Sequence, residues 1–349
     1  MLTRRQMLAT TSTFAGYAIA VDKVLAQAIK TDTDGIVAGD QVVKIGTYEM
    51  PVYEARPATG KDHAIVLVLS EIWGVHEYIR DCTRRFAKAG YYAVAPELFK
   101  REGGVAQIPN VQDILKIVLA QKREQTLGDC KAAVDWAKTR PNVKATSVGV
   151  TGWCWGGSTV YQVAATNPDM KAAVAWYGPP ARPYQGAAGP VSGFDLARDI
   201  KAPFLGLYGE TDQNPKPEDA RRFGELVKQH NPNVEVVVYP GAGHGFHADY
   251  RPSYNAAAAT DAWKRCTFRR AVQNRTVHHP STVNAAGRRR GARGVDRTRS
   301  RNGEAGGARP DGAQPPRSSA RAPRGPATPL APRRCPRPRL PSQADGRRS

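Results

Sequence analysis

Short, continuous apolar runs alternate along the chain with segments whose apolar residues recur every three or four positions. Residues 64–69 and 204–209 are apolar throughout, as expected of strands buried on both faces of a sheet. Alternation of strand and helix patterns predicts an α/β fold, a mostly parallel sheet with helices on both faces. The predicted strands are residues 42–53, 64–69, 91–95, 148–153, 171–177, 204–209 and 234–239, and the predicted helices are residues 76–89, 108–122, 126–140, 158–165, 218–229 and 254–264.

A tight turn follows the strand at residues 148–153, and it reads Gly-Trp-Cys-Trp-Gly-Gly over residues 152–157. A cysteine with small residues two positions before and after it has the pattern of a nucleophile elbow in which Cys replaces Ser. The turn needs Gly152 and Gly156, because a Cβ at either position would crowd a strained nucleophile backbone. Cys154 would stand at a helix N-terminus, whose dipole favours a thiolate. The alternative is a buried structural cysteine beside a glycine turn.

Three polar residues follow other predicted strands. Asp212 comes after the strand at 204–209, and His244 after the strand at 234–239. The order nucleophile, acid, histidine is that of α/β-hydrolase triads, so we expect Cys154, Asp212 and His244 to meet at one sheet edge. Glu71 follows the strand at 64–69 and would be costly to bury unpaired. Spacing alone leaves Glu71 either exposed or partnered at a functional site.

From about residue 42 to residue 265, the chain resembles the dienelactone hydrolase family. The resemblance rests on Leu-Ser-Glu-Ile-Trp-Gly-Val at 69–75, Gly-Tyr-Tyr-Ala-Val-Ala-Pro-Glu-Leu-Phe at 90–99, the elbow, and Ala-Gly-His-Gly-Phe at 242–246. It implies an α/β-hydrolase fold and hydrolysis of lactones or carboxylic esters through a thioester on a Cys-Asp-His triad. Another triad acyl hydrolase, an acyltransferase or a peptidase remains the alternative function.

The resemblance also implies roles for residues around the elbow. Glu71 would contact the resting cysteine and take part in forming its thiolate. Backbone N–H groups of Ile72 and Trp155 would form the oxyanion hole.

The chain departs from the family at the two arginines that hold the substrate carboxylate. Ala248 stands at one of these positions, and residues 110–116 offer no arginine for the other. Arg251 could replace them if residues 248–250 fold back over the pocket, unless Asp249 neutralises it; Lys116 is a second candidate. We therefore expect only a modest preference for carboxylate-bearing lactones over neutral ones.

The N-terminus resembles a twin-arginine export signal over residues 1–28. Arg4 and Arg5 precede a moderately apolar run that is too short and polar to span a bilayer, and Ala-Gln-Ala at 26–28 supplies a cleavage site. A chance arginine pair in a disordered start is the alternative. This interpretation predicts cleavage near Ala28 and a periplasmic enzyme. Residues 29–41 are predicted to be a linker to a single domain over 42–265.

The composition changes abruptly after residue 265. Residues 266–349 contain no Lys, Trp, Tyr, Met or Ile, and twenty arginines against four acidic residues give them sixteen of the chain's twenty net positive charges. Burial of these few apolar side chains cannot offset the entropy cost of ordering the segment. We therefore expect a disordered tail. Its origin is open among a nucleic-acid-binding extension, a linker, and translation of GC-rich DNA in a shifted frame. The dominance of Arg, Pro, Ala and Gly favours the last.

The five cysteines show neither disulfide nor metal spacing. We expect Cys82 and Cys130 to be buried and unpaired, Cys266 to belong to the tail, and His247 and His230 to lie on the surface. We further expect no metal, no cofactor, no nucleic-acid partner and no stable membrane anchor. The partner would be a small ester or lactone, and the protein a monomer.

Overall fold

A central sheet of eight strands organises the computed structural model, which describes residues 29–267. Its strand order is β1-β2-β4-β3-β5-β6-β9-β10; β2 runs antiparallel to both of its neighbours, β1 and β4, and all remaining neighbours are parallel. The mostly parallel sheet predicted from the alternating patterns is therefore confirmed. The strands are β1 (Ile36–Ile45), β2 (Tyr48–Pro57), β3 (His63–Leu69), β4 (Tyr92–Pro96), β5 (Val143–Trp153), β6 (Met170–Trp176), β9 (Phe204–Gly209) and β10 (Val234–Tyr239).

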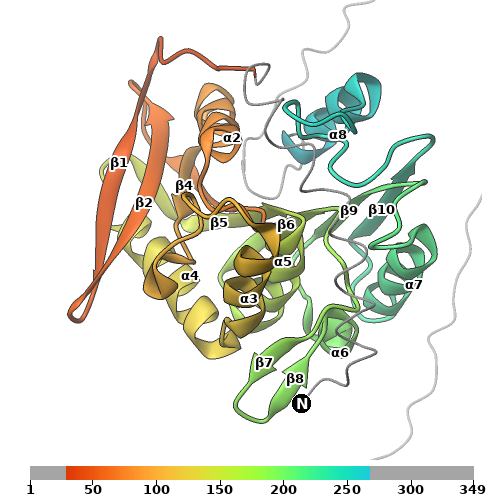
Figure 1. The fold of residues 1–349 in the computed structure, drawn as a ribbon. Coiled ribbons are helices and arrows are strands. Elements are labelled where there is room, and N and C mark those ends of the chain that lie inside the picture. Colours follow the sequence, from red (N-terminus) through yellow and green to blue (C-terminus); the bar gives the residue numbers. More distant parts are fainter. Residues whose placement is uncertain (1–28, 268–349) are drawn as a thin grey trace, which may run out of the picture. The chain divides into compact units, whose positions relative to one another are not determined.

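Helices cover the two faces of this sheet unequally (Figure 1). On one face, α2 and α8 pack over a core that includes Phe86 and Ala262. On the other face, α3, α4, α5 and α7 pack over a core that includes Val134 and Phe223. Sandwiching the sheet buries the continuous apolar strands on both sides. The helices are α2 (Glu77–Lys88), α3 (Val111–Ala120), α4 (Arg123–Lys138), α5 (Trp155–Thr166), α6 (Gly193–Leu196), α7 (Pro217–Lys228) and α8 (Ala256–Thr267), with short 3₁₀ turns η1 (Lys100–Glu102) and η2 (Ala197–Asp199).

Parallel pairing brings the carboxyl ends of five neighbouring strands to one edge. β3, β5, β6 and β9 are neighbours that all run in the same direction, and β10 continues this order beside β9. Ligand sites of open α/β sheets lie outside this edge. The segments after β3, β5, β9 and β10, which carry the polar residues singled out from the sequence, therefore converge there.

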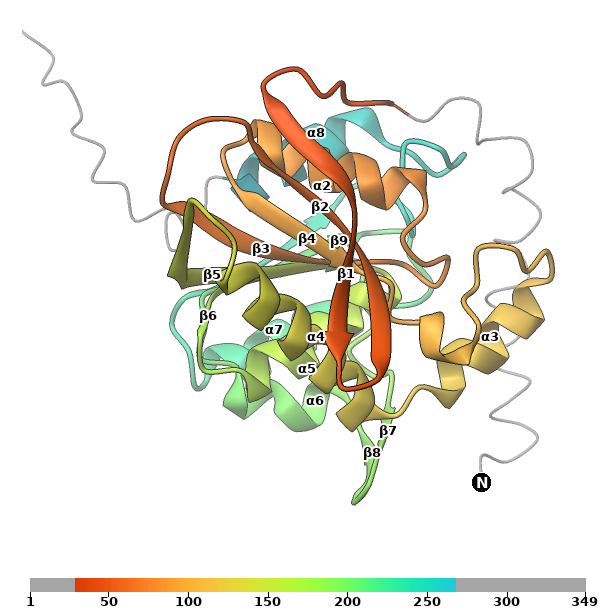
Figure 2. The same ribbon diagram turned by 90° about the vertical axis from the view of Figure 1, so that its left-hand side faces the viewer.

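The N-terminal part of the domain differs from the sequence expectation. Residues 29–41 are not simply a linker, because β1 begins at Ile36 and pairs along its whole length with β2. The strand expected over 42–53 is two strands of a hairpin, joined at Gly46, whose φ of +60° glycine adopts readily. Figure 2 shows this hairpin facing the viewer at the edge of the sheet.

The Pro- and Gly-rich segment after residue 178 contains a small hairpin of β7 (Tyr184–Gly186) and β8 (Gly189–Val191), seen beside α6 in Figure 2. One further expectation is wrong in detail. Cys266, assigned to the tail, is buried in the last turn of α8, which extends to Thr267. The twin-arginine segment at 1–28 and the tail from residue 268 lie outside the described residues.

Among residues 29–267, no helix has the length and apolar character needed to cross a membrane.

Candidate active site

Cys154 lies between the end of β5 and the start of α5, in a strained backbone conformation. Its φ is +54° and its ψ −114°, a combination that non-glycine residues rarely adopt. The backbone N–H of Cys154 donates to the carbonyl of Trp176 at 3.0 Å, which ties the elbow to β6. Cys154 is the N-cap residue of α5, and the dipole of this helix favours a negative sulfur at its N-terminus.

The elbow glycines are required by contact with backbone. A Cβ on Gly152 would lie 2.4 Å from the carbonyl oxygen of Gly156. A Cβ on Gly156 would lie 2.4 Å from the carbonyl oxygen of Leu69, at the end of β3. Both distances are far below van der Waals contact, so any side chain would push the turn away from the neighbouring strand.

The structure places Asp212 and His244 in direct contact. The Nδ1–H of His244 donates to Oδ2 of Asp212 at 2.9 Å, and Oδ1 of Asp212 accepts from the N–H of Asn214 at 2.8 Å. Both side chains are buried. The backbone N–H of Thr211 donates to the carbonyl of Ala242 at 2.9 Å and holds the two loops together. With Nδ1 engaged, the imidazole presents Nε2 to its other neighbours.

The electrostatics of His244 favour its protonated form. Burial opposes protonation, but the Asp212 carboxylate and the Cys154 sulfur together raise the pKa of His244 well above its usual range. Cys154 acts both through its charge and through a hydrogen bond to the imidazole. The arrangement therefore suits an ion pair between a thiolate and an imidazolium.

Ile72 and Trp155 lie in the segments that follow β3 and β5. Trp155 is the first residue of α5, so its backbone N–H has no acceptor within the helix. Ile72 lies just beyond the end of β3, against which Gly156 packs. Two N–H groups from these segments are the usual components of an α/β-hydrolase oxyanion hole.

Glu71 is fully buried and partnered at the same edge. Its Oε2 accepts from the hydroxyl of Tyr250 at 2.6 Å and lies 3.6 Å from Nε2 of His76, while Oε1 lies 3.4 Å from Nη2 of Arg251. Burial alone would raise the pKa of Glu71, but Arg251, then His76 and Tyr250, lower it to about 2. Glu71 is therefore an ionised carboxylate at neutral pH.

The described polar contacts of Glu71 go to Tyr250, His76 and Arg251, and Cys154 is not among them. In this structure Glu71 thus interacts with the guanidinium of Arg251 rather than with the sulfur.

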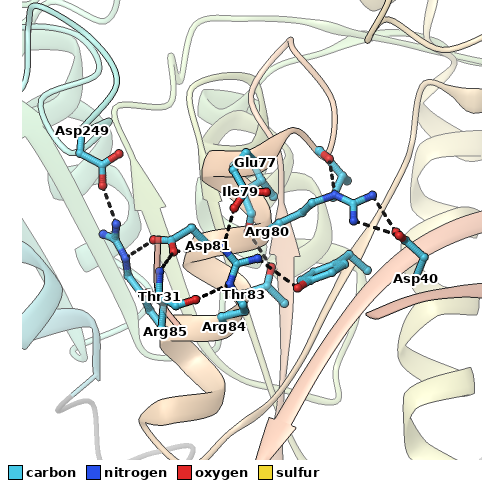
Figure 3. A network of polar contacts seen from close by, with 12 residues as sticks. Thr31, Asp40, Glu77, Ile79, Arg80, Asp81, Thr83, Arg84, Arg85 and Asp249 are labelled. Carbon is cyan, nitrogen blue, oxygen red and sulfur yellow. Dashed lines mark hydrogen bonds and ion pairs between the residues drawn. The ribbon is translucent and has the colours of Figure 1, made fainter. Parts of the chain in front are cut away.

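Asp249 does not neutralise Arg251, which was one alternative left by the sequence. Figure 3 shows Asp249 bound instead by Arg85 of α2, whose Nε lies 2.6 Å from Asp81. Arg84 of the same helix binds Asp81 as well. This network fixes the loop after β10 against α2 and directs Arg251, two residues further on, toward Glu71.

Lys116, the other candidate cation, is exposed and pairs with Asp113 at 2.6 Å.

His247 is buried, so the expectation that it lies on the surface is wrong. Its ring lies among Trp153, Trp176 and Trp263, and its Nδ1 accepts from the hydroxyl of Tyr78 at 2.6 Å. The loop after β10 folds under α8, which sequence spacing did not reveal. Burial, assisted by Arg85, lowers the pKa of His247 to about 3. His230 is exposed as expected.

This burial predicts an acid-dependent loss of stability. Below pH 6.5, His247 is protonated in the unfolded chain but stays neutral in the folded protein. The free energy of unfolding therefore decreases as the pH is lowered. Relative to His247→Phe, the wild-type free energy of unfolding should fall by about 2 kcal/mol between pH 7 and pH 5. Urea denaturation at both pH values measures it. Parallel pH profiles for the two proteins would contradict a neutral buried His247.

Three residues near the site escaped the sequence analysis. His76 and Tyr250 hold Glu71, as described above. Arg182 lies in the Pro- and Gly-rich loop after β6, and its guanidinium stacks near the rings of Trp155 and Tyr184. No local pattern distinguishes an arginine that packs against buried rings from one that faces solvent. No group of three or more metal-ligating side chains occurs within residues 29–267.

Comparisons with known proteins agree on one family. Residues 50–269 match the model of the dienelactone hydrolase family. A "Putative carboxymethylenebutenolidase" of Methylorubrum extorquens is 44% identical over 266 residues, which cover 76% of this chain and 91% of that protein. A protein of the same name from Escherichia coli is 40% identical, over 72% of this chain and 93% of that protein.

A solved structure shows the same fold. The crystal structure titled as a "Putative Dienelactone Hydrolase" from Klebsiella pneumoniae is 38% identical, with a TM-score of 0.62, and the match covers 66% of this chain and 96% of that one. The chain therefore belongs to the dienelactone hydrolase family and is a carboxylic ester hydrolase with the α/β-hydrolase fold.

Proposed function

We propose that the protein hydrolyses lactones and carboxylic esters through a thioester on Cys154, with Asp212 and His244 completing a catalytic triad. The observation that carries this proposal is a strained cysteine at a helix N-terminus whose sulfur helps raise the pKa of a histidine already bound to a buried aspartate. Nucleophile, base and orienting acid occur together in this way at acyl-transfer sites.

In the first half of the reaction, the Cys154 thiolate attacks the carbonyl carbon and a C–S bond forms. The N–H groups of Ile72 and Trp155 stabilise the resulting oxyanion, and one such donor is worth about 3 kcal/mol in the transition state. His244, held by Asp212, gives its proton to the leaving alkoxide as the C–O bond breaks. In a lactone this alkoxide stays attached to the acyl group, so the ring opens.

In the second half, His244 takes a proton from water, and the hydroxide adds to the thioester carbonyl. The C–S bond breaks, the carboxylic acid leaves, and the thiolate and imidazolium are restored. Asp212 stabilises the imidazolium through its hydrogen bond with Nδ1 of His244.

In this proposal Glu71 is a positioning residue. A carboxylate whose pKa is about 2 is a poor acceptor for a thiol proton, so His244 is the better base for Cys154. Glu71 instead holds the buried side chains of Arg251 and Tyr250 in the loop after β10.

A burst experiment with the full-length protein tests the proposal. Mixing with a 4-nitrophenyl ester should release nitrophenolate and leave an acyl group on Cys154, which mass spectrometry of the quenched enzyme would locate. Turnover without an acyl adduct on Cys154 would contradict the thioester. Adding an alcohol or amine acceptor distinguishes a hydrolase, whose product stays the free acid, from an acyltransferase.

We also propose that residues 1–28 direct export to the periplasm, because Arg4 and Arg5 precede an apolar run and a small-x-small cleavage site. Residues 1–40 fused to a folded reporter should bring it to the periplasm. Replacing Arg4 and Arg5 together with lysine should abolish this, as cell fractionation would show. Export that survives the double substitution would exclude the twin-arginine route.

A further inference from the structure

The first described residues of the chain lie against α2 and are tied to it by hydrogen bonds. The backbone N–H of Thr31 donates to Oδ1 of Asp81, and the backbone carbonyl of Thr31 accepts from Nε of Arg84 at 2.9 Å. Figure 3 shows both contacts. The chain that follows residue 28 is therefore held at a fixed place on the domain, beside this helix.

Asp249, in the loop after β10, reaches the same place. Only 2% of its side chain is exposed, and Oδ2 accepts from Nη2 of Arg85. Burial raises the pKa of Asp249, Arg85 lowers it, and a hydrogen bond from the backbone N–H of Ile29 lowers it further. This last contact is the smallest of these influences, and Oδ1 has no hydrogen-bond partner of normal geometry among residues 29–267. One oxygen of a buried carboxylate thus lacks a strong donor.

The network around Asp249 carries one more negative than positive charge. Its described ion pairs set three carboxylates against two guanidiniums, on the side chains of Glu77, Asp81, Asp249, Arg84 and Arg85. A buried carboxylate that is short of positive charge costs stability. One further cation beside Asp249 would balance the network.

We propose that proteolytic cleavage between Ala28 and Ile29 supplies this cation, because the α-ammonium group of Ile29 then binds the Asp249 carboxylate. Ala-Gln-Ala at 26–28 is a small-x-small cleavage site directly before this bond, and Ile29 is half exposed. A peptidase of the export machinery would make the cut. The inference rests on the cleavage site of the proposed export signal and not on the proposed hydrolase mechanism.

Hydrolysis converts a neutral donor into a charged one at the same place. The hydroxyl group of water joins the carbonyl carbon of Ala28 as the C–N bond breaks, and the nitrogen of Ile29 takes the remaining hydrogen. The new carboxyl group then releases a proton, and the new amine takes one up. Hydrogen bonds between charged groups are roughly twice as strong as neutral ones. The loop that carries His244 and Arg251 is thereby fastened more firmly through Asp249.

Cleavage of the folded full-length protein tests the proposal. A factor Xa site directly before Ile29 is created by four substitutions, Leu25→Ile, Ala26→Glu, Gln27→Gly and Ala28→Arg. Cleavage should raise Tm at pH 7 by about 2–4 °C. It should also slow amide hydrogen exchange in the loop after β10, which mass spectrometry follows. The chain without the four substitutions, treated with the same protease, accounts for cuts elsewhere and should show neither change.

The matched control has the same site with one glycine inserted before Ile29. Cleavage removes the same residues 1–28, but the amine lies one residue, about 3.8 Å, further along the chain. Its Tm should rise by less than half as much.

The pH dependence identifies the charged group. An α-amine has a pKa of about 8 in an unfolded chain, and a neighbouring carboxylate raises this pKa in the folded protein. The gain in Tm should therefore be complete at pH 7 and decline as the pH rises from 8 to 10. Arg85 and Asp81, which also face Asp249, are present before and after the cut, so their influence cancels in the difference.

Asp249→Asn keeps the shape of the side chain and removes its charge, so cleavage should no longer raise Tm. An equal Tm before and after cleavage, a rise that survives Asp249→Asn, or an equal rise in the glycine control overturns the proposal. If Asp249→Asn fails to fold, the glycine control decides alone. Because factor Xa makes the cut, the comparison remains decisive even if residues 1–28 do not direct export or the protein does not hydrolyse esters.

Discussion

Replacing Cys154 with alanine should abolish ester hydrolysis, with kcat falling by at least about a thousandfold. No other group in the elbow can form the acyl intermediate, and loss of a triad nucleophile leaves only the contribution of substrate binding and the oxyanion hole. Cys154→Ser should also have low hydrolytic activity, because a hydroxyl ionises far less readily than a thiol beside an imidazolium. Steady-state rates with 4-nitrophenyl esters, corrected for folded protein, measure both effects.

Cys82→Ala and Cys130→Ala are the matched controls. Both thiols are buried away from the elbow, and burial raises their pKa values, so neither is a ready nucleophile. Each variant should keep most of the activity. Substantial turnover by Cys154→Ala, or its loss in either control with the fold intact, would overturn the assignment of the nucleophile.

Gly156→Ala should destabilise the domain strongly, by about 3 kcal/mol. The added Cβ would lie 2.4 Å from the carbonyl oxygen of Leu69 and 2.5 Å from that of Ser70, both backbone atoms at the end of a central strand. Backbone in the middle of a sheet cannot move aside as a flexible side chain can, so the cost reaches the upper part of the range for overpacked sites. Chemical denaturation measures the change.

Gly128→Ala provides the control for adding the same methyl group elsewhere. Gly128 lies on the exposed side of α4, and a Cβ there would meet nothing within 4 Å. Because alanine favours helix over glycine, this variant should be more stable than wild type by about 0.5–1 kcal/mol. Equal stability of the two variants would show that the elbow tolerates a side chain at position 156, against the geometry described above.

The sequence by itself determined the sheet, the elbow and the triad candidates. Continuous apolar runs and helical spacing are local signals, and parallel strands separated by helices leave few possible topologies. The glycines on either side of Cys154 indicate the tight turn directly, because a residue with a Cβ would clash with neighbouring backbone there. Cys154, Asp212 and His244 could be proposed as partners because each follows its own strand, and parallel strands end at one edge.

The tertiary structure decided what the polar residues around that edge do. Arg251 pairs with Glu71 because Arg85 binds Asp249 and directs the loop, a contact between residues 164 positions apart. His247 looked like a surface residue, yet α8 and three tryptophans bury it.

Arg182 differs from an exposed arginine only in its neighbours, which come from α3, α5 and its own loop. Burial and charge pairing depend on segments that meet only in the folded chain, and no local pattern encodes them. Hydrophobic periodicity thus determines the scaffold, whereas long-range packing determines the electrostatics of the site.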